Sequence, residues 1–323
     1  MDVLDKIKAP VAAELEQFNE AFRKTLYSDN PLLETAVEHL LKAPGKQIRP
    51  LLVLLSARMV GKVDEKVINV ALALEMLHTA TLVHDDVVDE SDRRRGLPSV
   101  NALLSSQVAV LTGDYILSKA LECAALTEDV RVVRYIAQLG QALADGELLQ
   151  LDNKDSDVLS ESAYFDIISR KTASLFSVCA RLGALAAGGS EADAERLGQF
   201  GKLVGICFQI RDDVFDYGTA EVGKPVGNDM KEGKLTLPAI YAVKHSENEE
   251  MLELALKVRR REATAKEIQK LIDFTVSEGG LEYAAWHMKD MQGMADGLID
   301  DTREASIAEA LHLLASFVAE RVF

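Results

Sequence analysis

Cysteine and proline are scarce in this sequence of 323 residues. The three cysteines, Cys123, Cys179 and Cys207, are an odd number without CxxC spacing, so no complete disulfide framework is expected, and a reducing cytoplasm fits. No stretch rich in proline, glycine or serine stands where a linker between domains would be needed. We therefore predict a single domain over residues 1–323.

Positive charge is also in short supply. Lys and Arg number 36 against 52 Asp and Glu, which gives a net charge of -16. This charge repels phosphate backbones and anionic lipids, so nucleic-acid binding is not expected. An acidic protein that handles phosphate groups must either gather its few cations or recruit metal ions to its carboxylates.

Long uninterrupted apolar runs are missing too. The N-terminal segment MDVLDKIKAP has no basic part followed by an apolar part, so we expect no signal peptide. The longest apolar stretch, residues 67–83, contains Glu75 and His78 and falls short of the ~20 apolar residues of a membrane span. We expect no membrane span and a cytoplasmic location.

What the sequence does have is helical periodicity. Apolar residues recur at spacings of three and four almost throughout, which predicts an all-α protein. Residues 72–84, 107–125 and 200–210 are apolar nearly all round, as is typical of helices at the centre of a bundle or at a subunit interface. The glycines, prolines and charges of residues 217–238 predict a long loop, with 218–233 either a lid or a disordered segment.

Two aspartate-rich pentads end long apolar runs: Asp85-Asp86-Val87-Val88-Asp89 and Asp212-Asp213-Val214-Phe215-Asp216. On a helix the first and last aspartates of each pentad share a face, and paired carboxylates suit Mg²⁺, which also takes waters and phosphate oxygens. One such motif could be a solvated helix end. Two of them, each opposed to the helix dipole, indicate a metal site that clamps a diphosphate.

Basic residues accompany these acids. Lys46 and Arg49 stand three residues apart at the predicted start of a helix, which favours an anion. Further basic positions complete the set: Arg93-Arg94-Arg95, Lys171-Thr172, Lys224 and Lys234. Each alone is more typical of a solvated surface. Together they indicate two anion sites, one mediated by metal and one purely cationic.

Six motifs occur in one order: GKQIRP, LVHDDVVDESDRRRG, GELLQ, KTASLF, FQIRDDVFDY and GKPVGNDMKEGKLTLP. In this series, from about Leu32 to the C-terminal helices, the sequence resembles the trans-isoprenyl diphosphate synthases, most of all the long-chain, octaprenyl-type polyprenyl synthases. The resemblance implies an antiparallel helical bundle around a deep central cavity, the isoprenoid synthase fold, and a homodimer. It implies condensation of isopentenyl diphosphate with an allylic diphosphate such as farnesyl diphosphate.

The resemblance also assigns roles to residues. The metal ligands, which would hold about three Mg²⁺ ions, are Asp85, Asp86, Asp89, Asp212, Asp213 and Asp216. The other allylic diphosphate contacts are Arg94, Lys171, Thr172, Gln209, Lys224 and Lys234. The isopentenyl diphosphate contacts are Lys46, Arg49, His78 and Arg95, with His78 where short-chain relatives have glutamine. The catalytic residues are Asp85, Asp86, Asp89, Asp212 and Lys171.

The implied reaction is ionisation of the allylic diphosphate, attack by the isopentenyl double bond, and loss of a proton to the departed diphosphate. The small residues Ala80 and Thr81 lie one turn before the first pentad, where the growing tail would pass. Met76 and Leu77, one turn further, either line the deeper cavity or belong to the core. The resemblance thus implies an all-trans product of about C30 or longer, as used for a quinone side chain.

Three alternatives stay open. A shorter-chain synthase, with products of about C15 to C20, would share the same motifs. A class I terpene cyclase would share the first pentad, but it has no second diphosphate for GKQIRP and Arg95 to hold. A non-catalytic subunit of a heteromeric synthase would be expected to lose carboxylates, and all six are present. Exact product length, allylic starter and oligomeric state are not determined by the sequence.

Overall fold

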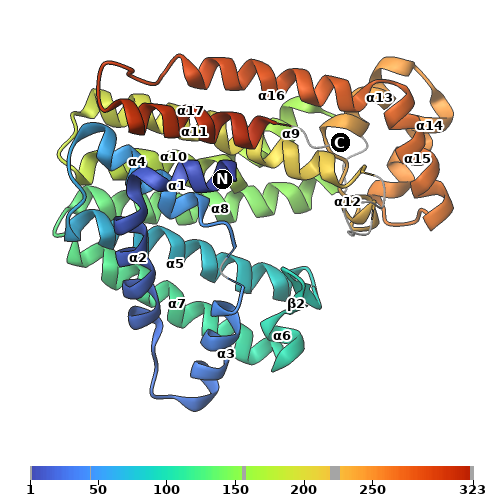
Figure 1. Cartoon of the computed structure of the whole chain (residues 1–323). Helices are drawn as coiled ribbons and strands as arrows, with labels where there is room; N and C mark the ends of the chain where they lie inside the picture. Colours follow the sequence, from blue (N-terminus) through green and yellow to red (C-terminus); the bar gives the residue numbers. More distant parts are fainter. Residues whose placement is uncertain (1, 44, 155–157, 219–225, 321–323) are drawn as a thin grey trace. The chain divides into compact units, whose positions relative to one another are not determined.

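The computed structural model describes residues 2–43, 45–154, 158–218 and 226–320 (Figure 1). Most of them are helical, which confirms the all-α fold class. The elements are α1 (Val3–Lys8), η1 (Ala9–Val11), α2 (Ala12–Leu26), α3 (Pro31–Leu41), α4 (Ile48–Val60), α5 (Glu65–Val88), β1 (Arg93–Arg94), β2 (Leu97–Pro98), α6 (Val100–Leu103), α7 (Ser106–Leu126), α8 (Val130–Lys154), α9 (Glu161–Ile168), η2 (Ser169–Ala173), α10 (Ser174–Ala186), α11 (Glu191–Phe215), α12 (Asn228–Lys231), α13 (Leu237–Ser246), α14 (Glu249–Arg259), α15 (Ala265–Ser277), α16 (Gly280–Asp296) and α17 (Ala305–Ala319).

The chain forms two compact units, each assembled from three segments. The first unit comprises Met1–Gly140, Val178–Gly198 and Asp300–Leu311. The second comprises Gln141–Ser177, Gln199–Ile299 and His312–Phe323. The single-domain organisation stays a prediction.

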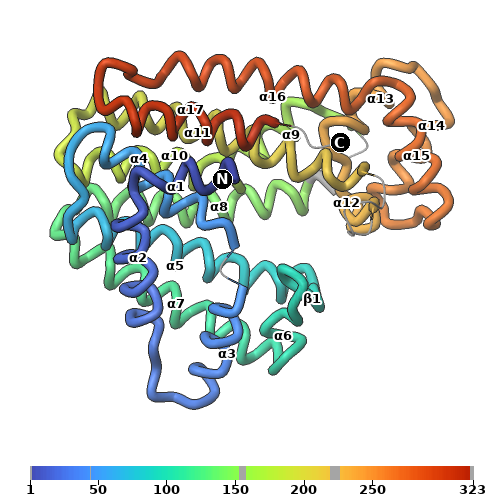
Figure 2. Tube along the Cα trace, in the orientation of Figure 1, coloured from blue at the N-terminus to red at the C-terminus, as the bar shows by residue number. Residues whose placement is uncertain are grey.

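Helix α5 is the centre of the first unit. It lies beside α7 and also packs against α4 (Figure 2). Its residues from Val70 to His78 are all buried, because this part of the helix is apolar nearly all round. By length and composition α5 is the one described helix that could cross a membrane, but 72% of its most apolar part is buried in the fold, as is typical of a core helix.

A short hairpin follows α5 and was not predicted from the sequence. Strand β1 pairs antiparallel with β2, with Arg94 opposite Leu97. The two residues between the strands, Arg95 and Gly96, have φ angles of 51° and 81°. Positive φ at both central residues is the signature of the type I′ turn, whose twist matches that of paired strands. An arginine in this conformation is unusual and therefore draws attention to the turn.

The second unit contains the end of α11, where the second pentad lies. Helix α13 packs against α15 and α16, and also contacts α9. Between α9 and α10 the chain makes a π-helical turn, η2, which contains Lys171 and Thr172. Such π turns are rare and are often found at functional sites. Part of the predicted loop is helical, because α12 begins at Asn228.

Candidate active site

The first pentad forms the last turn of α5, where Asp86 is only 4% exposed. The Arg94 guanidinium donates two hydrogen bonds to Oδ1 of Asp86, from Nε at 2.9 Å and from Nη2 at 2.5 Å. Asp85 and Asp89 are half-buried. The hairpin thus brings a predicted phosphate contact, Arg94, directly to a predicted metal ligand.

Arg95, the next residue of the turn, reaches a different place. Its Nη1 donates to the carbonyl oxygen of Ala43 at 2.7 Å. Its guanidinium lies so close to Gly45 that a Cβ there would be 2.8 Å from the Arg95 Cζ. Gly45 also has a φ of 72°, which favours glycine. Arg95 therefore lies against Gly45, the first residue of the GKQIRP segment. The exposed Lys46 directly follows Gly45 in the sequence.

The buried His78 and Glu75 and the half-buried Arg49 lie near Arg95. Burial lowers the pKa of His78 well below its usual value, and Arg49, Arg95 and Arg94 lower it further, so the imidazole is neutral at pH 7. Burial lowers the pKa of Arg49, while the charge of Glu75 raises it. Burial raises the pKa of Glu75, against the opposing effect of Arg49. The structure therefore gathers Arg49, His78 and Arg95 as the sequence predicts, and adds one acid.

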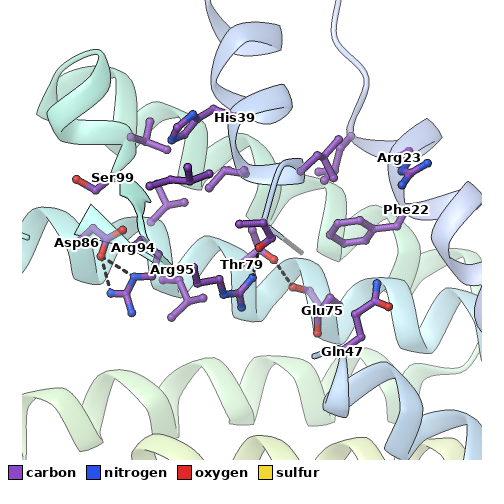
Figure 3. A pocket seen from close by; sticks show the side chains of 18 of the residues that line it. Phe22, Arg23, His39, Gln47, Glu75, Thr79, Asp86, Arg94, Arg95 and Ser99 are labelled. Carbon is purple, nitrogen blue, oxygen red and sulfur yellow. Dashed lines mark hydrogen bonds and ion pairs between the residues drawn. The ribbon is translucent and has the colours of Figure 1, made fainter. Parts of the chain in front are cut away.

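A pocket of about 190 Å³ lies beside these residues in the first unit (Figure 3). Figure 3 shows Arg94 turned toward Asp86 at one end of it, and Glu75 close to Gln47 at the other. The α5 residues that line it lie on one face of the helix, at positions related by three, four or seven residues: Glu75, Thr79, Leu82, Val83 and Asp86. Ala80, Thr81 and Asp85 lie on other faces of the helix.

The second pentad is held by a network within the second unit. Asp213 is 5% exposed, and both of its carboxylate oxygens accept hydrogen bonds. Tyr164 Oη donates to Oδ2 at 2.6 Å, and Gln209 Nε2 donates to Oδ1 at 2.8 Å. Thr172 Oγ1 donates in turn to Gln209 Oε1 at 2.7 Å. The predicted allylic-site residues Thr172 and Gln209 therefore lie together with Asp213.

Asp216, the last aspartate of this pentad, binds the start of α12. Its Oδ1 accepts the backbone N–H of Asn228 and its Oδ2 that of Asp229, each at 2.9 Å. Burial raises the pKa of Asp229 to about 7, with a further contribution from Asp216, while Lys234 opposes it. Burial and the charge of Asp229 also raise the pKa of Asp213. Asp229, which the sequence reasoning missed, thus joins the acidic group.

Lys171 makes an ion pair with Glu147 of α8. Helix α8 and the π-helical turn η2 approach closely at Gly146, where a Cβ would be 2.9 Å from the Lys171 backbone nitrogen. Glu147 and Gly146 belong to the GELLQ motif, which was noted in the sequence but given no role. The structure indicates that this motif supports the Lys171-Thr172 turn.

These carboxylates suit a hard divalent cation such as Mg²⁺. Within the described parts of the chain, no three His, Cys, Asp or Glu side chains gather closely enough to hold a metal by themselves. Mg²⁺ does not require that, because it keeps several waters and takes one or two carboxylates plus substrate phosphate oxygens. Burial raises the pKa values of Asp213, Asp216 and Asp229, and the charge of a neighbouring aspartate raises those of Asp213 and Asp229 further, so a nearby cation would stabilise the ionised carboxylates. These carboxylate oxygens therefore fit the ligand preference of Mg²⁺.

Some predicted site residues are not brought together here. Lys224 lies outside the described residues. The first pentad belongs to the first unit and the second to the second unit, so their facing arrangement stays a prediction. Ala80, Met76 and Leu77 are buried and Thr81 is half-buried. Their role as a floor for the product also stays a prediction.

Comparison with known proteins gives one consistent result. The family profile "Polyprenyl synthetase" matches residues 30–275. The octaprenyl diphosphate synthase of Haemophilus influenzae is 34% identical over 320 residues, which cover 98% of this chain and 97% of that protein. The crystal structure of a polyprenyl synthase from Caulobacter crescentus, complexed with calcium and isoprenyl diphosphate, has a TM-score of 0.92 at 33% identity, covering 99% of this chain and 98% of that one.

A second solved structure differs in the product that its name gives. The geranylgeranyl pyrophosphate synthase from Bacteroides thetaiotaomicron is 40% identical, with a TM-score of 0.87 and 99% of each chain covered. The similarity thus extends over almost the full chain and includes synthases of different product length. The chain belongs to the polyprenyl synthetase family and is a prenyltransferase.

Proposed function

We propose that this enzyme condenses isopentenyl diphosphate with an allylic diphosphate such as farnesyl diphosphate to an all-trans product of about C30 or longer. The observation that carries the proposal is that two distinct groups of charged and polar side chains lie beside one hairpin. Arg94 pairs with Asp86, whereas Arg95 lies with Gly45, Arg49 and His78. A prenyltransferase that joins two diphosphates needs a place for each, while a cyclase needs only one.

Mg²⁺ would be held by the carboxylates of the two pentads, Asp85, Asp86, Asp89, Asp212, Asp213 and Asp216, with about three ions expected. The bound metal would supply Lewis-acid stabilisation of the charge that develops on the departing diphosphate. The crystallised relative that is complexed with calcium and isoprenyl diphosphate supports the use of a divalent metal.

The protein's own cations would bind the two diphosphates. The basic side chains of Arg94, Lys171 and Lys234 would stabilise the allylic diphosphate as it departs. Thr172 and Gln209 would add neutral hydrogen-bonding groups. Lys46, Arg49 and Arg95 would orient isopentenyl diphosphate, with the neutral His78 donating as an amide would. Holding both substrates in one orientation supplies much of the rate, because it replaces a chance encounter.

The product length is proposed from Ala80 and Thr81, which are too small to block a tail that passes them. The octaprenyl synthase relative supports a long product. The geranylgeranyl synthase relative keeps open a product of about C20. We propose that the product serves as a quinone side chain and that the enzyme works in the cytoplasm.

We also propose a homodimer. Helix α7, which packs on α5, leaves several large apolar side chains exposed. Leu111 is 67% exposed and Leu121 48%. Just beyond the helix, Val130 is 80% exposed. Exposed apolar side chains gathered along one helix are typical of a subunit interface.

The test is incubation of the purified chain with Mg²⁺, farnesyl diphosphate and excess radiolabelled isopentenyl diphosphate, followed by chain-length analysis of the dephosphorylated products. A ladder that ends at about C30 or above supports the proposal. Products that stop at about C15 to C20 refute the length. No incorporation by the chain alone favours the non-catalytic subunit, and a hydrocarbon formed without isopentenyl diphosphate favours the cyclase. EDTA is the control for metal dependence.

A further inference from the structure

Tyr164 is a buried tyrosine on α9 that the sequence reasoning did not single out. It is 6% exposed, and its hydroxyl donates to Asp213 at 2.6 Å. The two residues are 49 positions apart in the chain. A tyrosine hydroxyl that donates to a carboxylate makes a charge-assisted bond, which is shorter and stronger than a neutral one.

The hydrogen bonds around Asp213 have one consistent direction. Thr172 donates to the Gln209 carbonyl oxygen, the Gln209 amide donates to Asp213 Oδ1, and Tyr164 donates to Oδ2. The donation from Thr172 determines which end of the Gln209 side chain is NH₂. Asp213 receives one donor on each oxygen, so its carboxylate plane cannot rotate without breaking a bond.

An ionised carboxylate has about four lone-pair sites, of which these two bonds occupy two. The remaining sites stay available to a cation. Partners of this kind orient a metal-binding side chain, and their removal typically weakens metal affinity by about 10-fold to 100-fold. Within the described parts of the chain the Tyr164 hydroxyl donates to Asp213 alone, so its role is to hold that carboxylate.

We propose that Tyr164 is a positioning residue for the second aspartate motif: its hydroxyl orients Asp213 for the divalent metal, and through Asp213 and Gln209 it keeps Thr172 in place for the allylic diphosphate. The proposal rests on the proposed function, because it takes Asp213 as a metal ligand. Tyr164 itself touches neither metal nor substrate.

The test compares Tyr164→Phe with Tyr283→Phe. Tyr283 is the matched control, because its hydroxyl also donates to a carboxylate of the same unit, Glu161, at 2.9 Å. Free Mn²⁺ is measured by electron paramagnetic resonance as the metal is titrated into protein that holds farnesyl thiolodiphosphate, an unreactive analogue. We expect Tyr164→Phe to weaken Mn²⁺ binding about 10-fold or more, with the control unchanged. Steady-state kinetics should show a matching rise in the Mg²⁺ requirement, with the KM for isopentenyl diphosphate unchanged.

The double variant separates positioning from a general structural role. If Tyr164 acts through Asp213, adding Tyr164→Phe to Asp213→Asn should change Mn²⁺ binding no further. Equal Mn²⁺ affinity of Tyr164→Phe and wild type, or additive effects in the double variant, would overturn the proposal. If Tyr164→Phe lowers the Tm so far that it does not fold, Gln209→Leu, which removes the other donor, is expected to weaken Mn²⁺ binding in the same way. A wild-type protein that incorporates no isopentenyl diphosphate would refute the proposed function instead.

Discussion

The Arg95 guanidinium lies against Gly45, 2.8 Å from the position that a Cβ would occupy. Because φ at Gly45 is 72°, a larger residue there is strained as well as crowded. The contact joins the hairpin after α5 to the loop before α4. A proposed anion site is therefore formed by segments that lie 50 residues apart in the sequence.

Gly45→Ala should displace Arg95 and weaken isopentenyl diphosphate binding. Losing a charge-assisted contact costs about 1.5 to 3 kcal/mol, so KM for isopentenyl diphosphate should rise about 10-fold to 100-fold. Steady-state kinetics measures it. Gly188→Ala is the control, because Gly188 also has a positive φ, 85°, but nothing lies within 4 Å of its added Cβ. Equal KM values for the two variants would contradict the role of the contact.

Asp85→Ala should lower turnover at least about 100-fold, because it removes one of the few carboxylates that are proposed to bind the metal. The rate is measured over a range of Mg²⁺ concentrations. Asp273→Ala, which changes an exposed aspartate on α15, should behave as wild type. A near-wild-type rate for Asp85→Ala at saturating Mg²⁺ would remove Asp85 from the metal site.

His78→Gln should keep isopentenyl diphosphate binding, because the buried imidazole is neutral. The free energy of unfolding of this variant should, however, depend on pH differently from that of wild type. The pKa of His78 is lowered in the folded protein, so only the unfolded chain takes up this proton as the pH falls below ~6.5. Wild type should therefore lose up to about 1.4 kcal/mol per pH unit relative to the variant, down to the lowered pKa. Urea unfolding at pH 7.5 and 5.5 measures it, with the exposed His245→Gln as control. A constant difference would mean that His78 is accessible to protons.

Ala80→Phe should shorten the product if Ala80 faces the growing tail. Ala80 is 1% exposed, so if it faces the core instead, the larger ring would cost about 1 to 3 kcal/mol of stability and leave product length unchanged. Product analysis and thermal unfolding together decide between these outcomes. Ala80→Ser, a small change, should keep the wild-type length.

Leu111→Glu should dissociate the proposed dimer. In a symmetric interface each substitution occurs twice, and burying two unpaired carboxylates should raise the Kd about 10-fold or more. Light scattering after size-exclusion chromatography measures the mass. Leu252→Glu, at a 41% exposed position on α14, should leave the mass unchanged. A monomeric wild type would refute the dimer.

The sequence predicted the parts of this site that depend on local patterns. Helix α5 and the first pentad at its end follow from the apolar spacing and the aspartates themselves. The hairpin does not, because its turn requires positive φ at an arginine, which no propensity favours. Tyr164 and Glu147 were also missed, because their contacts with Asp213 and Lys171 join segments distant in sequence.

The two-residue turn of the hairpin has a consequence for how this enzyme can change. Arg94 and Arg95 are consecutive, yet one reaches Asp86 and the other reaches Ala43 and Gly45. The turn consists of Arg95 and Gly96 alone, so inserting or deleting one residue there would change the turn and with it the relative placement of Arg94 and Arg95. Both proposed diphosphate sites thus depend on the length of one short turn. Evolution can vary this turn by substituting residues but not by adding or removing them.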